Sequence, residues 1–256
     1  MKQHFYKYQG TGNDFVLIDD RDKRFPQDTD LIARLCHRRF GIGADGLILL
    51  QEHPNLDFTM VYFNSDGRPS TMCGNGGRCI VRFAHDLGII GSQTRFMAVD
   101  GEHRAKVDRE DISLKMNDAS MATPREEGYF LDTGSPHHVQ KVEDTEEIHV
   151  FDLGRQMRNE IYGREGANIN FVQTMGDHLR IRTYERGVED ETYSCGTGVT
   201  AAALVSFQEG WTSESPVILE TLGGKLSVSF EREGARFTNI WLIGPAEYVY
   251  EGDIDL

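Results

Sequence analysis

The sequence predicts an α+β fold with two pseudo-symmetric halves, each a mostly antiparallel sheet wrapped around a central helix. A motif is repeated, as MCGNGGRC at 72–79 and SCGTGVTA at 194–201. Its cysteines, Cys73 and Cys195, are 122 residues apart, about half of the 256-residue chain. Two further pairs share this spacing: TGNDFV with TGSPHHV, and a tyrosine eleven residues before each motif cysteine. Three matches at one spacing indicate two similar halves.

The first half of the chain reads as strands with two helices. Apolar residues at helical spacing predict a helix over 30–39 and another over 76–87, with Gly88 as the stop of the second. Apolar or alternating runs predict strands at 16–19, 47–50, 58–63, 95–99 and 103–107.

The second half repeats this pattern around one main helix. Residues 199–208 are apolar nearly all round, so we expect a buried helix there. Strands are predicted at 129–133, 168–173, 179–184, 217–221, 226–230 and 237–243. Strands outnumber helices and come in runs, which favours an α+β fold over a βαβ array. The polar stretch 117–128 predicts the boundary. The first half then covers 1–118, joined by the C-terminal segment 246–256, and the second covers 119–245.

The composition restricts the partners and the location that we expect. The formal net charge is −14, with Lys and Arg scattered, which disfavours nucleic acid and anionic membrane surfaces as partners. No apolar run resembles a signal-peptide core or reaches the ~20 residues of a membrane span. We therefore expect a cytoplasmic protein. Four cysteines in a chain of this length do not make a disulfide framework, so they should be thiols.

The two repeated cysteines are the candidate chemical groups. Each precedes a glycine-rich turn that opens a predicted helix, where unpaired N–H groups and the helix dipole favour an anion. Such a site lowers the pKa of a thiol from its usual ~8.5. It can also hold a carboxylate. By contrast, we expect Cys36, in the middle of the 30–39 helix, and Cys79, which has no repeat counterpart, to be structural.

Two equivalent acid–base groups suit the inversion of a carbon centre. A base on one face of the carbon removes a proton, and an acid on the other face delivers one. Two similar thiols, one ionised and one protonated, can exchange these roles in the reverse direction. The sequence does not indicate which thiol is ionised at rest.

Six segments in chain order carry a family resemblance. They are GTGNDF at 10–15, GIGADG at 41–46, FNSDGRPSTMCGNGGRC at 63–79, GSPHH at 134–138, NINF at 168–171 and ERG…SCGTG at 185–198. Together they resemble diaminopimelate epimerase. The resemblance implies an active site in the cleft between the two halves. It implies interconversion of L,L- and meso-diaminopimelate, in lysine and peptidoglycan precursor biosynthesis. It implies a small amino-acid substrate, a homodimer and no cofactor, neither pyridoxal phosphate nor metal.

The resemblance also implies roles for individual residues. It makes Cys73 and Cys195 the proton-transfer pair, with His137 and Glu185 tuning them and positioning the reacting centre. The residues that it implies for substrate binding are Asn13, Asn64, Gly74, Asn75, Asn168, Glu185, Arg186, Gly196 and Thr197. The chain departs from the family pattern at Ser135 and Gly46, where a side-chain amide is common, and the ERG segment is one residue longer than expected. These departures bear on substrate recognition.

Other motifs have weaker interpretations. GIGADG at 41–46 fits G-x-G-x-x-G, but the predicted helix precedes it and the strand follows it, the reverse of a dinucleotide site. CGNGGRC resembles a phosphatase loop, but its arginine is one position too early. Adjacent His137 and His138 on a strand point to opposite faces, which disfavours a metal site.

Two alternatives remain for the function. One is an isomerase of the same fold acting on another amino acid, in the manner of a proline racemase. A substrate screen separates it from the first interpretation. The other is a thiol redox sensor that forms a disulfide between Cys73 and Cys195. Tight binding of a diaminopimelate analogue would argue against the sensor.

Overall fold

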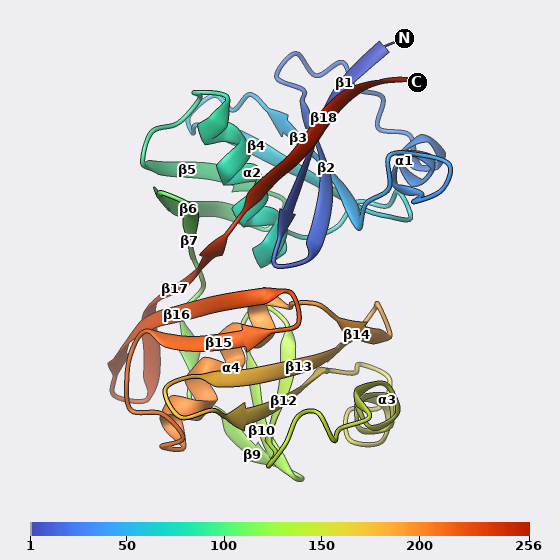
Figure 1. The fold of residues 1–256 in the computed structure, drawn as a ribbon. Coiled ribbons are helices and arrows are strands. Elements are labelled where there is room, and N and C mark those ends of the chain that lie inside the picture. The colour runs from blue at the N-terminus through green and yellow to red at the C-terminus, as the bar shows by residue number, and fades with distance from the viewer. Residues whose placement is uncertain (1) are drawn as a thin grey trace. The chain divides into compact units, whose positions relative to one another are not determined.

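A computed structural model describes residues 2–256 (Figure 1). The chain falls into two compact units. The first contains residues 1–114 and 244–256, and the second contains residues 115–243. The sequence predicts the corresponding boundaries after residues 118 and 245. Among the described residues, none of the helices has the length and apolar character needed to cross a membrane.

The first unit is a mixed sheet with two helices. Its helices are α1 (Thr29–Cys36) and α2 (Gly74–Asp86). Its strands are β1 (Lys2–Gly10), β2 (Asn13–Asp19), β3 (Gly46–Gln51), β4 (Phe58–Asn64), β5 (Gln93–Ala98), β6 (Gly101–Asp108), β7 (Asp111–Lys115) and β18 (Glu247–Asp255).

Strand direction in the first unit follows from the connections. Neighbouring strands run β18-β1-β2-β3-β4-β5-β6-β7, and most pairs are antiparallel. Only β2–β3 and β4–β5 are parallel within this run. These two connections pass through α1 and α2, as parallel neighbours require a crossover.

The second unit has the same plan. Its helices are α3 (Val150–Glu160) and α4 (Gly196–Gln208). Its strands are β8 (Ala119–Ser120), β9 (Thr123–Arg125), β10 (Gly128–Asp132), β11 (Pro136–Lys141), β12 (Asn168–Thr174), β13 (Leu179–Glu185), β14 (Asp190–Thr192), β15 (Val217–Thr221), β16 (Gly224–Glu233) and β17 (Arg236–Pro245).

The repeat extends to strand order and register. The run β9-β10-β11-β12-β13-β15-β16-β17 is antiparallel except at β11–β12 and β13–β15, which are crossed by α3 and α4. In the parallel pair β2–β3 of the first unit, Phe15 lies opposite Gly46. In the parallel pair β11–β12 of the second unit, His137 lies opposite Asn168. These two residues follow Phe15 and Gly46 in the sequence by the same 122 positions. The predicted α+β fold with two pseudo-symmetric halves is confirmed.

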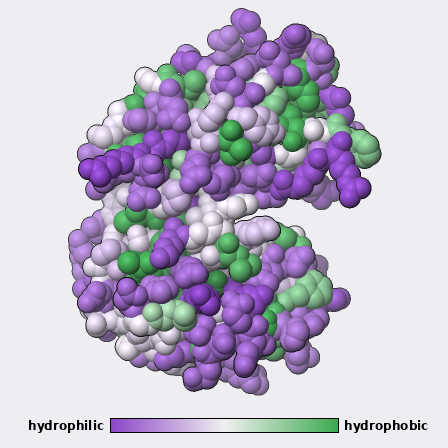
Figure 2. All heavy atoms as spheres, viewed as in Figure 1, coloured by the Kyte–Doolittle hydropathy of each residue, from purple (hydrophilic) through white to green (hydrophobic). Residues whose placement is uncertain are grey.

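Each unit packs around the second of its two helices, α2 in the first unit and α4 in the second. In the first unit, α2 contacts β1, β2, β3 and β6. In the second unit, α4 is buried continuously from Val199 through Ser206, which confirms the expected buried helix. In Figure 1, the strands β12, β13, β15 and β16 pass in front of α4. The face in Figure 2 is mostly hydrophilic, with apolar residues in small groups, because most large apolar side chains lie in the cores.

Two expectations about helices are corrected. The first helix ends at Cys36 and not at residue 39, because His37 adopts an extended backbone and its ring accepts from the Arg39 and Phe40 amides. Cys36 is therefore the last helical residue and not a mid-helix one. Helix α3 was not predicted, because it contains Gly154 and is rich in polar residues. A Cβ at Gly154 would lie 2.4 Å from Tyr184 Cβ, so close packing requires glycine there.

Candidate active site

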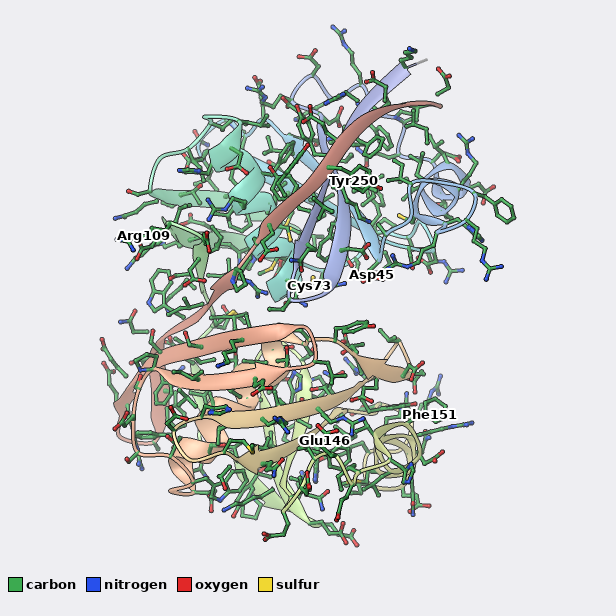
Figure 3. All side chains as sticks on the ribbon, viewed as in Figure 1. Asp45, Cys73, Arg109, Glu146, Phe151 and Tyr250 are labelled. Carbon is green, nitrogen blue, oxygen red and sulfur yellow. The ribbon has the colours of Figure 1, made fainter. Side chains whose placement is uncertain are left out.

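Cys73 begins the first of the two equivalent turns. It is the N-cap of α2, and its Sγ accepts a hydrogen bond from the Gly76 amide at 3.2 Å. The amide is one of the unpaired donors of the helix N-terminus, so it favours an ionised sulfur. Figure 3 places Cys73 and Asp45 at the same end of the first unit.

Arg78 is a fully buried cation on the same helix. Its guanidinium donates to the Gly74 carbonyl (3.3 Å), the Thr11 hydroxyl (3.1 Å) and the Asn75 amide oxygen (3.1 Å). These acceptors are neutral. Burial lowers the pKa of Arg78, while attraction to the Cys79 and Cys73 sulfurs opposes that effect. The same attraction, seen from the sulfur, stabilises a thiolate at Cys73.

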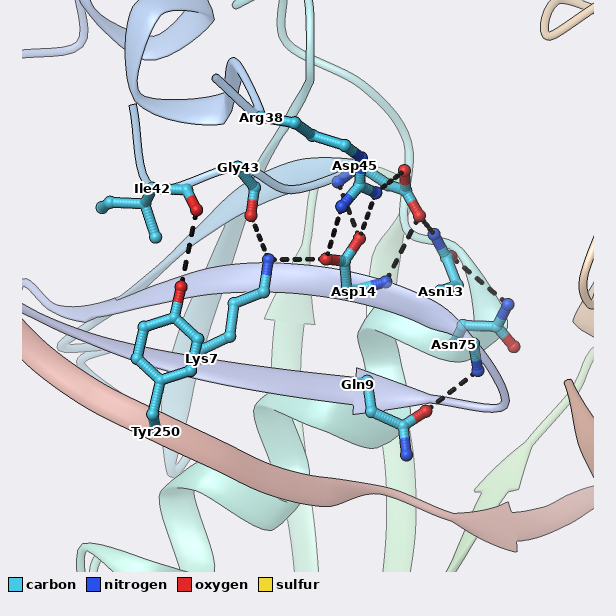
Figure 4. Close-up of polar contacts among 11 residues, drawn as sticks. Lys7, Gln9, Asn13, Asp14, Arg38, Ile42, Gly43, Asp45, Asn75 and Tyr250 are labelled. Carbon is cyan, nitrogen blue, oxygen red and sulfur yellow. Dashed lines mark hydrogen bonds and ion pairs between the residues drawn. The ribbon is translucent and has the colours of Figure 1, made fainter. Parts of the chain in front are cut away.

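The Asn13 side chain is fixed by polar neighbours in the first unit (Figure 4). Its Nδ2 donates to Asp45 at 2.8 Å, and its Oδ1 accepts from Asn75 Nδ2 at 3.3 Å. Asp45 also accepts from Arg38 at 2.7 Å. A carboxylate only accepts, so Asp45 sets which end of the Asn13 amide carries the hydrogens.

Asp14 lies at the centre of the same network. Lys7 and Arg38 each approach its carboxylate within 2.7 Å. Burial alone would raise the pKa of Asp14, but the hydrogen bonds and charges of Arg38 and Lys7 outweigh burial and lower the pKa to about 2. Lys7 is itself buried and also donates to the Gly43 carbonyl. This ion cluster joins β1, β2 and the 41–45 loop.

Cys195 begins the second turn with different neighbours. It precedes α4 and lies 3.5 Å from the Thr197 hydroxyl, with 8% of its surface exposed. The Thr197 Oγ1 in turn lies 2.9 Å from His137 Nε2. His137 therefore contacts the cysteine through Thr197. Burial, and then the charge of Arg186, lower the pKa of His137 to about 3, so the ring is neutral at physiological pH.

Asn168, Glu185 and Arg186 meet at the ends of two neighbouring strands. The Asn168 Oδ1 accepts from the Arg186 amide at 2.8 Å, and its Nδ2 lies 3.4 Å from His137 Nε2. Glu185 ends β13 and accepts from the Thr192 hydroxyl at 3.0 Å. The predicted residues of the second half thus lie together with Cys195 in one unit.

Gly46 and Ser135 are the two positions at which the chain departs from the family pattern. A Cβ at Gly46 would lie 2.5 Å from the Tyr62 ring and 2.6 Å from the Phe63 carbonyl oxygen. The Tyr62 ring therefore fills the space beside this position. Asn64 lies opposite Gly46 at the exposed end of β4. Ser135 lies in the β10–β11 turn, where its carbonyl accepts from the Thr133 amide.

The other two cysteines have environments that hold them as thiols. Burial raises the pKa of Cys36 to about 12. Burial also raises the pKa of Cys79, far above its usual range. None of the four cysteines forms a disulfide in the part of the chain that the structure describes. Within residues 2–256, no group of three or more His, Cys, Asp or Glu side chains is arranged to hold a metal ion.

Three polar residues at the site were not named from the sequence. Asp45 orients Asn13, Arg78 lies beside the first cysteine turn, and Asn170 contacts His137. All three lie within the motifs that carry the family resemblance, which is the only indication that the sequence offers. Their contacts cross from one element to another, so spacing along the chain does not reveal them.

The chain is similar to known proteins over almost its whole length. A family model described as diaminopimelate epimerase matches residues 5–122 and 129–249. The diaminopimelate epimerase of Flavobacterium psychrophilum is 54% identical over 253 residues, which cover 97% of this chain and 99% of that protein. The diaminopimelate epimerase of Aquifex aeolicus is 40% identical, covering 97% of this chain and 96% of that protein.

Solved structures share the fold at low sequence identity. A Bacillus anthracis phenazine biosynthesis protein of the PhzF family has a TM-score of 0.75 at 14% identity, with all of both chains covered. A hydroxyproline epimerase from Agrobacterium vitis has a TM-score of 0.69 at 12% identity, covering 100% of this chain and 93% of that one. At these identities the likeness concerns the fold alone.

Proposed function

Because this chain belongs to the diaminopimelate epimerase family, we propose that it interconverts L,L- and meso-diaminopimelate with Cys73 and Cys195 as its acid–base pair. One cysteine, as a thiolate, takes the α-proton and becomes a thiol. The other, as a thiol, gives its proton to the opposite face of the same carbon and becomes a thiolate. The substrate neither gains nor loses atoms, and the reverse reaction exchanges the two roles.

The equivalent placement of the two cysteines carries this proposal. Cys73 directly precedes α2 and Cys195 directly precedes α4, at positions related by the 122-residue repeat. Each sulfur also has a hydrogen-bonding neighbour, the Gly76 amide for Cys73 and the Thr197 hydroxyl for Cys195. By contrast, the raised pKa values of Cys36 and Cys79 make these thiols poor bases.

The polar residues at the strand ends suit an amino-acid substrate. We propose that Asn64, Asn168, Glu185 and Arg186 hold the α-ammonium and α-carboxylate groups, and that Asn13 contacts the distal end. The backbone amides after each cysteine are suited to a carboxylate. This assigns supporting contacts to Gly74, Asn75, Gly196 and Thr197. The α-carbanion is far more basic than a thiolate, so these fixed donors must supply most of the stabilisation.

Cofactor, assembly and location are part of the same proposal. We propose that the reaction needs neither pyridoxal phosphate nor metal, so neither added pyridoxal phosphate nor EDTA should change activity.

We also propose a homodimer, and the exposed apolar side chains Tyr248, Val249 and Tyr250 on β18 are candidates for its contact. Sedimentation velocity tests the dimer. A cytoplasmic location would keep the catalytic thiols reduced.

Incubation with L,L-diaminopimelate in D2O tests the activity. We expect meso-diaminopimelate to form with deuterium at the inverted α-carbon. Cys36→Ala is the matched control for Cys73→Ala and Cys195→Ala, because it removes a thiol of the same protein away from the two turns. Turnover of proline or hydroxyproline instead of diaminopimelate would support the alternative isomerase. No turnover, and no binding of a diaminopimelate analogue, would support the redox sensor.

A further inference from the structure

We propose that Asn170 is a positioning residue that fixes the tautomer of His137 and thereby directs the Thr197 hydroxyl hydrogen toward Cys195. This inference rests on the proposed role of Cys195 as a proton-transfer group. It assigns a purpose to a polar side chain that is fully buried, on a strand of the second unit.

The orientation of the Asn170 amide is determined by its neighbours. Its Nδ2 lies 2.8 Å from the His138 carbonyl oxygen, which only accepts. This end of the amide must therefore carry the hydrogens. The other end, Oδ1, accepts from the Thr183 hydroxyl at 3.0 Å. Both ends of the buried amide are thus held, and a flipped amide would face one oxygen with another.

The amide orientation determines where His137 carries its hydrogen. Asn170 Nδ2 also lies 3.2 Å from His137 Nδ1. Asn168 Nδ2 faces the other ring nitrogen, Nε2, at 3.4 Å, but it lies nearer to the Pro136 carbonyl oxygen, at 3.3 Å. The shorter contact, from Asn170, places the lone pair on Nδ1 and the single hydrogen of the neutral ring on Nε2. Full burial of His137 keeps the ring neutral, with its pKa lowered to about 3.

The His137 tautomer then determines what the Thr197 hydroxyl does. The Nε2–H group donates to Thr197 Oγ1 across 2.9 Å. The hydroxyl has one hydrogen of its own, and the Cys195 sulfur lies 3.5 Å from its oxygen. That hydrogen is directed to the sulfur. A hydrogen bond to the charged form favours it, so the chain of donors stabilises a thiolate at Cys195.

Two observations distinguish this series of hydrogen bonds from ordinary core packing. A Cβ at Gly198 would lie 2.5 Å from Asn170 Oδ1 and 3.3 Å from His137 Cε1, so α4 packs directly against the amide. The repeat positions of His137 and Asn170 in the first unit are the apolar residues Phe15 and Ile48. The fold therefore does not require polar groups at these two places.

Iodoacetamide alkylation of Cys195, followed by peptide mapping at several pH values, tests the proposal. In Asn170→Leu, we expect the alkylation rate at pH 7 to fall about tenfold and its pH profile to move to higher pH, from loss of a hydrogen bond to a charged group. We also expect kcat to fall with KM little changed. Thr200→Val is the control, because it removes another buried hydroxyl of α4 whose partner is the Gly196 carbonyl. It should keep the wild-type pH profile.

A double-variant comparison and a spectroscopic measurement complete the test. In His137→Gln, the amide of glutamine can donate to Thr197 without help, so adding Asn170→Leu should have no further effect on Cys195. In wild-type protein, ¹⁵N NMR should show His137 with its hydrogen on Nε2, a result that does not depend on the folding of any variant. A hydrogen on Nδ1, an imidazolium, or an unmoved profile in Asn170→Leu would overturn the proposal. These measurements need no substrate, so an inactive protein with the Nε2–H ring would refute only the proposed function.

Discussion

Cys73 and Cys195 occupy equivalent positions, yet different groups surround them. Cys73 accepts from the backbone amide of Gly76, and the buried guanidinium of Arg78 lies on the same helix. Cys195 contacts the Thr197 hydroxyl, which connects it to the neutral His137. The first turn therefore contains a buried cation, whereas the second contains a series of neutral donors.

The repeat preserves the backbone of the two turns but not the charges of their side chains. Arg78 and Thr200 are 122 residues apart, and each side chain donates to the carbonyl four residues before it, Gly74 or Gly196. The backbone plan is thus the same, while the side chains set different local charges. A two-base reaction needs one acid and one base, and unequal surroundings can bias which cysteine is ionised first.

The largest expected effect comes from removing either sulfur. Cys73→Ala and Cys195→Ala should each lower epimerisation by about 10²–10⁴-fold, the usual contribution of a general acid or base. Cys36→Ala and Cys79→Ala should leave it mostly intact. The assay is meso-diaminopimelate formation from the L,L isomer. Near-normal turnover in Cys73→Ala or Cys195→Ala would mean that the two turns do not share the chemistry.

Oxidation tests whether the two thiols act on one carbon. Diamide should inactivate the enzyme by joining Cys73 to Cys195, and a reductant should restore activity. A disulfide needs Cα atoms about 4.4–6.8 Å apart, and thiolates are the form that reacts with oxidants. Bound diaminopimelate should protect both thiols. Peptide mapping identifies the bridge, and a product at Cys36 or Cys79, or no protection, would contradict the two-base arrangement.

Arg78 tests the difference between the turns directly. Arg78→Met should slow iodoacetamide alkylation of Cys73 at pH 7 by about tenfold, because a nearby buried cation stabilises a thiolate. Cys195 should be unaffected in the same sample, which provides an internal control. Arg78→Lys retains the charge and should restore most of the Cys73 rate. Equal slowing of both cysteines would indicate a general loss of structure instead.

The smallest expected effect concerns acid stability of the first unit. The pKa of Asp14 is lowered to about 2, against about 3.9 when unfolded, so its stabilisation is present above about pH 4 and is lost as the pH falls toward 2. Asp14→Asn should cost about 1–2 kcal/mol at pH 6, allowing for the solvent-exposed Arg38, and little at pH 2.

The second unit provides the control for this measurement. Its repeat position for Asp14 is Pro136, which cannot form the same ion cluster. Hydrogen exchange of β2 peptides in urea should therefore depend on pH through Asp14, while that of β11 peptides should not change in the variant. An equal loss in Asp14→Asn at pH 6 and pH 2 would argue against a role for its charge.

Sequence patterns predicted the elements whose residues repeat regularly. The stripe of apolar residues over 76–87 corresponds to α2, and the apolar run over 199–208 corresponds to α4, each within three residues of its observed start. Gly88 follows α2 with a positive φ, as expected of a C-terminal stop. Helix α3 was missed because its buried face consists mainly of Val150, Gly154 and Met157, too few large apolar residues to form a clear stripe.

By itself, the sequence determined the two-half fold, the cysteine at the start of each central helix, and the family. These properties follow from local patterns and from a repeat that can be read along the chain. Only the tertiary structure decided which polar groups meet each sulfur. His137, Asn170 and Thr197 come from β11, β12 and α4, and the parallel register of the two strands brings their side chains together. Hydrogen bonds form over a few ångströms in space, so residues far apart in sequence determine them jointly.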